Sequence, residues 1–122
     1  MKKIFLFIFL LSSCVDKLHK IAVVKNQSNK NITVVFEPID SISDKTLFYG
    51  SKYKVNAKSS REIYDLGYHF EKIHFFIFND DSVYNNINKG KVKGIVEKSF
   101  LKKVTVSSDS LKKNDTIVYK GY

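Results

Sequence analysis

The sequence predicts a mainly β protein, folded as a single antiparallel β-sandwich with one or two short helical turns. Three observations predict it. Short runs of β-branched and aromatic residues recur at a spacing of roughly 8–12 residues. Polar segments rich in Asn, Ser and Gly separate these runs, as turns separate strands. The chain of 122 residues is long enough for one compact domain.

The first two strands are predicted from residues 21–24 and 32–36, which are rich in Ile and Val. The segment 25–31 between them is polar, and two such runs around an Asn/Ser cluster predict an antiparallel hairpin. Pro38 closes the second run because proline lacks the N–H that a sheet needs. Residues 37–45 are then expected to form a loop.

The next strands are expected at residues 47–49 and 53–57, with a bulge or turn at Gly50 between them. Residues 53–57 alternate apolar and polar side chains, the period of a half-buried strand. A turn at 58–60 leads to a strand over 61–66. Residues 73–78 are the most apolar segment after the N-terminus, which predicts a central strand buried on both faces.

The second half mixes helix and strand signals. Asp80-Asp81-Ser82 is expected to cap a short helix that runs to Ile87. Residues 92–100 fit helical spacing, whereas 102–106 read as a strand. Residues 108–114 predict one helical turn capped by Ser108, and 116–119 a final strand. Together these elements favour an immunoglobulin-like or transthyretin-like sandwich.

The N-terminus has the pattern of an export signal. Lys2 and Lys3 are followed by an apolar run over residues 4–11 and by the small residues Ser12 and Ser13. A positive start, a short apolar stretch and a small-residue exit are typical of a secretory signal peptide. The run is too short to be a spanning helix, which needs about 20 apolar residues.

Leu11-Ser12-Ser13-Cys14 resembles the lipobox of bacterial lipoproteins, in which two small residues separate Leu from Cys. The resemblance implies diacylglycerol on the Cys14 sulfur, cleavage before Cys14 and acylation of the new amino group, with palmitate as a typical chain. The expected organisation is a signal peptide over 1–13, a lipidated tether over 14–20 and one β-rich domain over 21–122. A plain secreted protein is the alternative.

Three later segments are similar to small, uncharacterised lipoproteins of Gram-negative bacteria. Residues 21–35 pair an Ile/Val strand with an Asn/Ser turn, and residues 73–81 form an apolar strand followed by Asp. Residues 106–119 contain a Ser-Asp-Ser-Leu-Lys-Lys-Asn turn before a closing strand. This resemblance implies a β-rich exported domain with no known activity. The expected location is the cell envelope, with a lipid anchor in the outer rather than the inner membrane; the periplasmic and surface faces both remain open. The resemblance carries over no functional residues.

The chain is basic, with a formal net charge of +9, and the leader holds two of its lysines. Nucleic acid, an anionic membrane surface and simple solubility are the three explanations for such a charge. Export argues against nucleic acid as a partner. A solvated face is the default for the densest basic stretch, with lipid headgroups, lipopolysaccharide or an acidic partner as alternatives; its members are Lys89, Lys91, Lys93, Lys98, Lys102 and Lys103.

Two groups of residues contain side chains of the types that bind metal ions. His69 and His74 lie near several carboxylates, but their spacing matches no known ligand motif. We expect His74 to be a hydrogen-bonded histidine of the core or a sheet edge. Asp80-Asp81-Ser82 lacks the Gly and distal Glu of a calcium loop, so helix capping is favoured. No metal or cofactor is expected.

No catalytic residues are predicted. The single cysteine, Cys14, is committed to lipid, so the domain has no internal disulfide, and the chain has no Trp for sugar stacking. Gly50-Ser51 lacks the rest of a nucleophile elbow. The leading hypothesis is a non-enzymatic, membrane-anchored binding or structural module that contacts membrane lipid through Cys14. The alternative is an accessory subunit that docks on an envelope partner through a strand edge, and an enzyme comes third.

Overall fold

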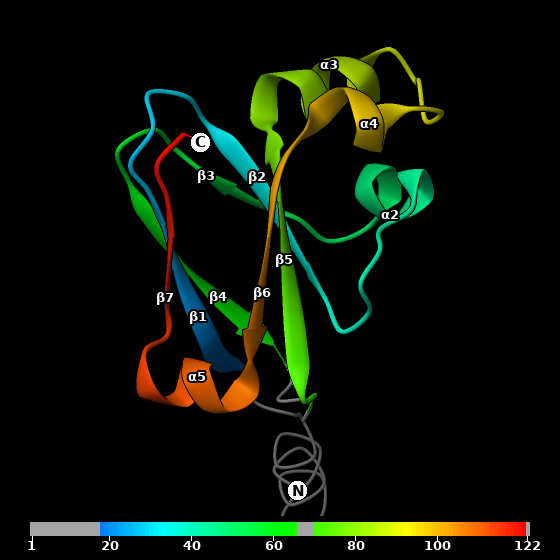
Figure 1. Ribbon diagram of the computed structural model, residues 1–122. Helices are drawn as coiled ribbons and strands as arrows, with labels where there is room; N and C mark the ends of the chain where they lie inside the picture. Colours follow the sequence, from blue (N-terminus) through cyan, green and yellow to red (C-terminus); the bar gives the residue numbers. More distant parts are fainter. Residues whose placement is uncertain (1–17, 66–69, 122) are drawn as a thin grey trace, which may run out of the picture.

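The computed structural model describes residues 18–65 and 70–121 and shows two packed β-sheets (Figure 1). One sheet has the strand order β4-β1-β7, and the other has the order β3-β2-β5-β6. The strands are β1 (His19–Asn26), β2 (Ile32–Glu37), β3 (Tyr53–Val55), β4 (Ser60–Asp65), β5 (Lys72–Asn79), β6 (Phe100–Ser107) and β7 (Thr116–Tyr119). The helices are α2 (Asp44–Tyr49), α3 (Asp80–Asn88), α4 (Ile95–Ser99) and α5 (Ser108–Lys113).

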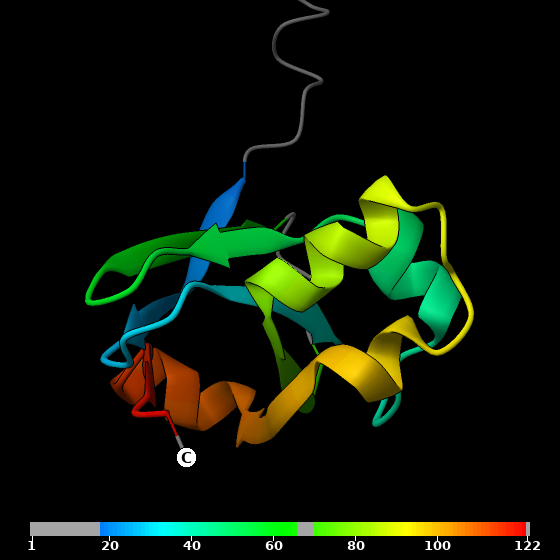
Figure 2. The ribbon, with the colours of Figure 1, turned by 90° about the horizontal axis from the view of Figure 1, so that it is seen from above.

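The domain has three layers, because the larger sheet is covered on both faces. The inner face packs on the smaller sheet through a core that includes Val24, Ile63, Phe75 and Ile117. On the outer face of the larger sheet lie α2, α3 and α4 (Figure 2). The short helix α5 joins β6 of one sheet to β7 of the other. The predicted mainly β, sandwich-like fold with few short helices is confirmed.

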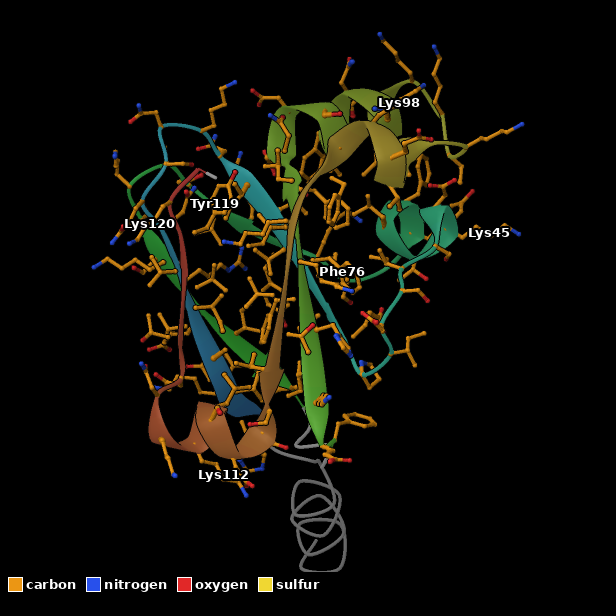
Figure 3. The ribbon with its side chains drawn as sticks, viewed as in Figure 1. Lys45, Phe76, Lys98, Lys112, Tyr119 and Lys120 are labelled. Carbon is orange, nitrogen blue, oxygen red and sulfur yellow. The ribbon has the colours of Figure 1, made fainter. Side chains whose placement is uncertain are left out.

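Strand β5 lies at the centre of this arrangement. Phe75 and Ile77 belong to the core between the sheets, while Phe76 and Phe78 belong to the core beneath the helices. Figure 3 shows Phe76 on the helix side of β5. Six consecutive residues, 73–78, are buried, which confirms the prediction of a strand covered on both faces. Each fully buried Phe contributes about 1.5–3 kcal/mol relative to an exposed one.

The predicted hairpin between the first two strands is wrong, since β1 and β2 belong to different sheets. The segment 27–31 forms an arch that crosses from one sheet to the other. Asn26, only 1% exposed, donates from Nδ2 to the carbonyls of Lys30 (2.8 Å), Val55 (3.2 Å) and Asn56 (3.2 Å). Its Oδ1 accepts from the N–H of Ser28 at 3.0 Å. These side-chain bonds stabilise the arch, whereas a hairpin would be stabilised by backbone hydrogen bonds between its two strands.

The last strand pairs with the first in parallel. Val23 faces Thr116 and Asn26 faces Tyr119 in this register, whereas the other strand pairs of both sheets run antiparallel. Strand β1 is therefore the central strand of its sheet, with β4 on one side and β7 on the other. The sandwich is antiparallel apart from this one pair.

Residues 47–49 form part of helix α2, so the strand predicted there is wrong. Ser43 caps the helix by accepting from the N–H of Thr46 at 3.1 Å. Leu47 is buried and packs with Val83 and Ile95 of the neighbouring helices. Gly50 ends α2, and a Cβ at this position would lie 2.4 Å from the carbonyl oxygen of Thr46. The glycine therefore permits a close approach of backbone to backbone.

The later elements follow the predictions more closely. Helix α3 runs from Asp80 to Asn88, with Asn79 rather than Asp80 as its cap. The ambiguous segment 92–100 contains α4, and β6 covers the strand expected over 102–106. Helix α5 is capped by Ser107, one residue before the predicted cap, through a 3.1 Å bond from the N–H of Ser110.

Candidate functional site

The residue singled out for lipidation, Cys14, lies outside the described residues, as does His69. The same holds for the leader over residues 1–13 and for most of the tether over 14–20. The described chain begins at Leu18, and β1 begins at His19, five residues after Cys14. The remaining candidate residues can be placed.

His74 is a buried, hydrogen-bonded residue of β5, as predicted. Its Nδ1 lies 2.8 Å from Oγ1 of Thr105 and 3.6 Å from Oδ1 of Asp40. A catalytic histidine uses one ring nitrogen toward its nucleophile and the other toward a carboxylate. Here both contacts meet the same nitrogen, so the cluster joins β5 to its neighbours without forming a relay. Lys103 pairs with Asp40 and, as the principal cause, lowers the pKa of that carboxyl.

Asp80 and Asp81 point to different environments. Asp80 is buried, accepts a 2.7 Å hydrogen bond from Oγ1 of Thr33 and lies 3.6 Å from Nζ of Lys54. Asp81 is exposed. Asn79 accepts from the N–H of Ser82 at 3.0 Å, which is the capping bond. The segment therefore starts a helix and ties it to β2 and β3, in keeping with the capping role.

An apolar hollow of about 210 Å³ opens between the sheets near the start of β1. Glu37 and Asp65 are its two carboxyl groups, and the other lining residues are Ile21, Phe36, Pro38, Phe70 and Ile73. Partial burial raises the pKa of Glu37 above its usual value. Pockets for drug-sized ligands occupy about 300–1,000 Å³, so this hollow suits a smaller group. Sequence reasoning did not identify it, because β1, β2, β4 and β5 all contribute.

Within the basic stretch predicted between Lys89 and Lys103, the members fall at or after the end of α3, on α4 and on two faces of β6. Lys89 ends α3, and Lys98 lies on α4. Lys102 and Lys103 are adjacent on β6, where successive side chains point to opposite faces. Lys103 forms an ion pair with Asp40 on the face of the larger sheet that the helices cover.

A different set of lysines gathers where the arch 27–31 meets the turn between β3 and β4. We call the cavity there the arch-end hollow; its volume is about 450 Å³. Its lining residues are Gln27, Ser28, Asn29, Lys30, Ile32, Lys58, Asn79, Leu101, Tyr119, Lys120 and Gly121. Lys30, Lys58 and Lys120 come from three distant segments, so no local motif could have revealed the group.

In residues 18–65 and 70–121 there is no group of three His, Cys, Asp or Glu side chains arranged to hold a metal ion. Within the same ranges no helix is both long and apolar enough to span a membrane. Comparisons of the chain with protein-family models, curated proteins and solved structures found no match.

Proposed function

We propose that this protein is a lipoprotein of the bacterial cell envelope, anchored to a membrane by lipid on Cys14, whose domain is a non-enzymatic binding or structural module. The observation that carries the proposal is the sequence Leu11-Ser12-Ser13-Cys14 placed five residues before β1. Five residues span at most about 18 Å. Lipid on Cys14 would hold the start of β1 close to the bilayer.

The end of the domain where β1 begins suits such a position. Leu18 is 62% exposed and Phe70 is 36% exposed. Phe70 lines the same hollow as Ile21, so both belong to this end. Exposed apolar side chains at a membrane-proximal surface can enter the headgroup region. Lys20 and Lys72 are also exposed here, and a lysine near anionic lipid contributes about 1 kcal/mol.

Strand β1 is eight residues long, which corresponds to about 25 Å. The arch follows its last residue, so the arch-end hollow lies far from the anchored end (Figure 1). In the anchored protein that hollow would face away from the membrane that holds Cys14. This orientation supports a module that meets its ligand or partner in the space beyond the bilayer.

The anchor is tested by comparing wild type with Cys14→Ala and with Ser13→Ala in bacteria fed a fatty-acid probe. Wild type and Ser13→Ala should be labelled and remain in the membrane fraction, because Ala preserves the small residue before the cysteine. Cys14→Ala should lose both properties. An intact mass that lacks added hydrocarbon on wild-type Cys14 would refute the proposal.

The second candidate function is docking on an envelope partner through β6. This strand pairs with β5 alone and forms an edge of the larger sheet. It is eight residues long, and its Leu101 is 41% exposed. Long edges with free backbone groups can accept a strand from another chain. Leu101→Arg should release a co-purifying envelope protein, whereas Tyr49→Arg, on α2, should not.

A further inference from the structure

The lysines of the arch-end hollow come from three segments that meet only in the folded protein. The arch supplies Lys30, the turn between β3 and β4 supplies Lys58, and Lys120 follows β7. A second hollow, of about 380 Å³, shares Lys58 and adds Lys25 from the end of β1. Four lysines therefore surround two adjoining hollows at one end of the domain.

Within the part of the chain that the structure describes, no carboxylate lines these hollows. Lys20, Lys54 and Lys103 form ion pairs with carboxylates, and all three lie outside the hollows. Elsewhere in the domain, Asp40, Asp80 and Asp115 each form an ion pair with a lysine. A cluster of cations around a concave surface attracts anions.

The backbone at Lys58 adds an independent observation. Lys58 has φ 58°, in the left-handed region that glycine or asparagine adopts more readily. The conformation is held by the arch: the N–H of Lys58 donates to the carbonyl of Ser28 at 3.2 Å, and its Nζ donates to the carbonyl of Gln27 at 2.6 Å. An ammonium has three donors, so two remain for a ligand.

We propose that the arch-end hollow binds an oligo-anion, a molecule that carries at least two neighbouring phosphate or carboxylate groups. Three separate cations suit several anionic groups better than one. A volume of about 450 Å³ falls in the range of small-molecule sites. Buried Asn26 fixes both the arch and the turn, so the lysine-bearing segments are arranged before a ligand arrives. The site does not depend on lipid at Cys14.

The test is calorimetric titration of the full-length protein in a neutral detergent, with sodium tripolyphosphate and with citrate as probes. Wild type should bind at least one of them, and the tighter probe identifies the preferred anion. Lys58→Gln and Lys120→Gln should each weaken binding about fivefold, as expected for a contact of about 1 kcal/mol. Lys112→Gln is the matched control, because Lys112 lies on α5 at the opposite end (Figure 3).

Two results would overturn the proposal. One is the absence of binding by either anion at millimolar concentration. The other is an equal loss of affinity in Lys112→Gln, which would show a response to net charge alone. Lys58→Gly provides a second check, because glycine readily adopts the left-handed conformation of this turn and the variant should fold; it should weaken anion binding as Lys58→Gln does. Wild-type affinity in this variant would also contradict the site.

Discussion

Replacing Asn26 with alanine should be among the most damaging single changes in this domain. The side chain is 1% exposed and donates hydrogen bonds to the carbonyls of Lys30, Val55 and Asn56. The amide shares two N–H groups among these three carbonyls, and its Oδ1 accepts from the N–H of Ser28, so the side chain makes about three full hydrogen bonds. A typical intramolecular hydrogen bond contributes about 1 kcal/mol net, which gives about 3 kcal/mol in all. Lys30 and Asn56 keep a second donor each, from Ser28 Oγ and a backbone N–H. We therefore add no further desolvation cost for those two acceptors.

The assay is urea unfolding followed by circular dichroism, in one detergent for all variants. With a slope of about 1.5 kcal/mol per molar, a loss of 3 kcal/mol lowers the midpoint by about 2 M. Asn29→Ala is the matched control: this exposed arch residue makes no side-chain hydrogen bond within the described chain and should change stability by less than about 0.5 kcal/mol.

Asn26→Asp separates the two halves of the interaction. The carboxylate keeps the acceptor that the N–H of Ser28 uses but cannot donate, so it should lose at least as much stability as the alanine variant. The reasoning fails if Asn26→Ala loses less than about 1 kcal/mol. It also fails if the aspartate variant matches wild type, since the donated bonds would then contribute little.

Three further predictions concern other polar contacts. Thr33→Val removes the buried hydroxyl that bonds Asp80 and should cost about 2 kcal/mol in urea unfolding, as for a bond to a charged group; a loss below 0.5 kcal/mol would contradict this. Asp44 accepts from two backbone N–H groups at the start of α4, which lower its pKa. Its stabilisation is therefore present above the unfolded-state pKa and lost as pH falls through the folded-state pKa, so the stability gap between wild type and Asp44→Asn should close on acidification. Burial raises the pKa of Glu37, so stability falls as pH rises through this pKa. Glu37→Gln should be more stable than wild type at pH 7, and this advantage should vanish in acid; a pH-independent difference would argue against it.

Strand identities could be predicted where the signal was local. Residues 73–78 are apolar without interruption except for His74, and this composition indicated a strand covered on both faces. The caps of α3 and α5 were found to within one residue, because Asn and Ser at helix starts form bonds to N–H groups two or three positions ahead.

Strand partners could not be predicted, because the deciding contacts are distant in sequence. Asn26 bonds Val55 and Asn56, about 30 positions away, and these bonds favour an arch over a hairpin. Leu47 has neighbours typical of a strand, yet Ser43 caps a helix there, and Asp44 joins that helix to the N–H of Gly94 and Val96. Tertiary contacts overrode local propensity in both places.

In the candidate site, too, roles set by local sequence could be predicted and groupings set by tertiary contacts could not. His74 could be assigned a hydrogen-bonded role from its place in an apolar strand. The lysines of the arch-end hollow could not be grouped, since Lys30, Lys58 and Lys120 are separated by long stretches of chain. The lysines between Lys89 and Lys103, by contrast, are close in sequence but are distributed from the end of α3 to α4 and β6.

The parallel pairing of β1 with β7 has a consequence for how the chain matures. Until residues 116–119 are synthesised, the backbone of Val23 and Val24 lacks its β7 partner on one side, and the smaller sheet stops at two strands. Contacts between segments far apart in sequence form late and slow the acquisition of structure. A ribosome-bound chain should thus stay open to proteases until Thr116 to Tyr119 arrive, and a nonsense mutation before them should leave an unstable product.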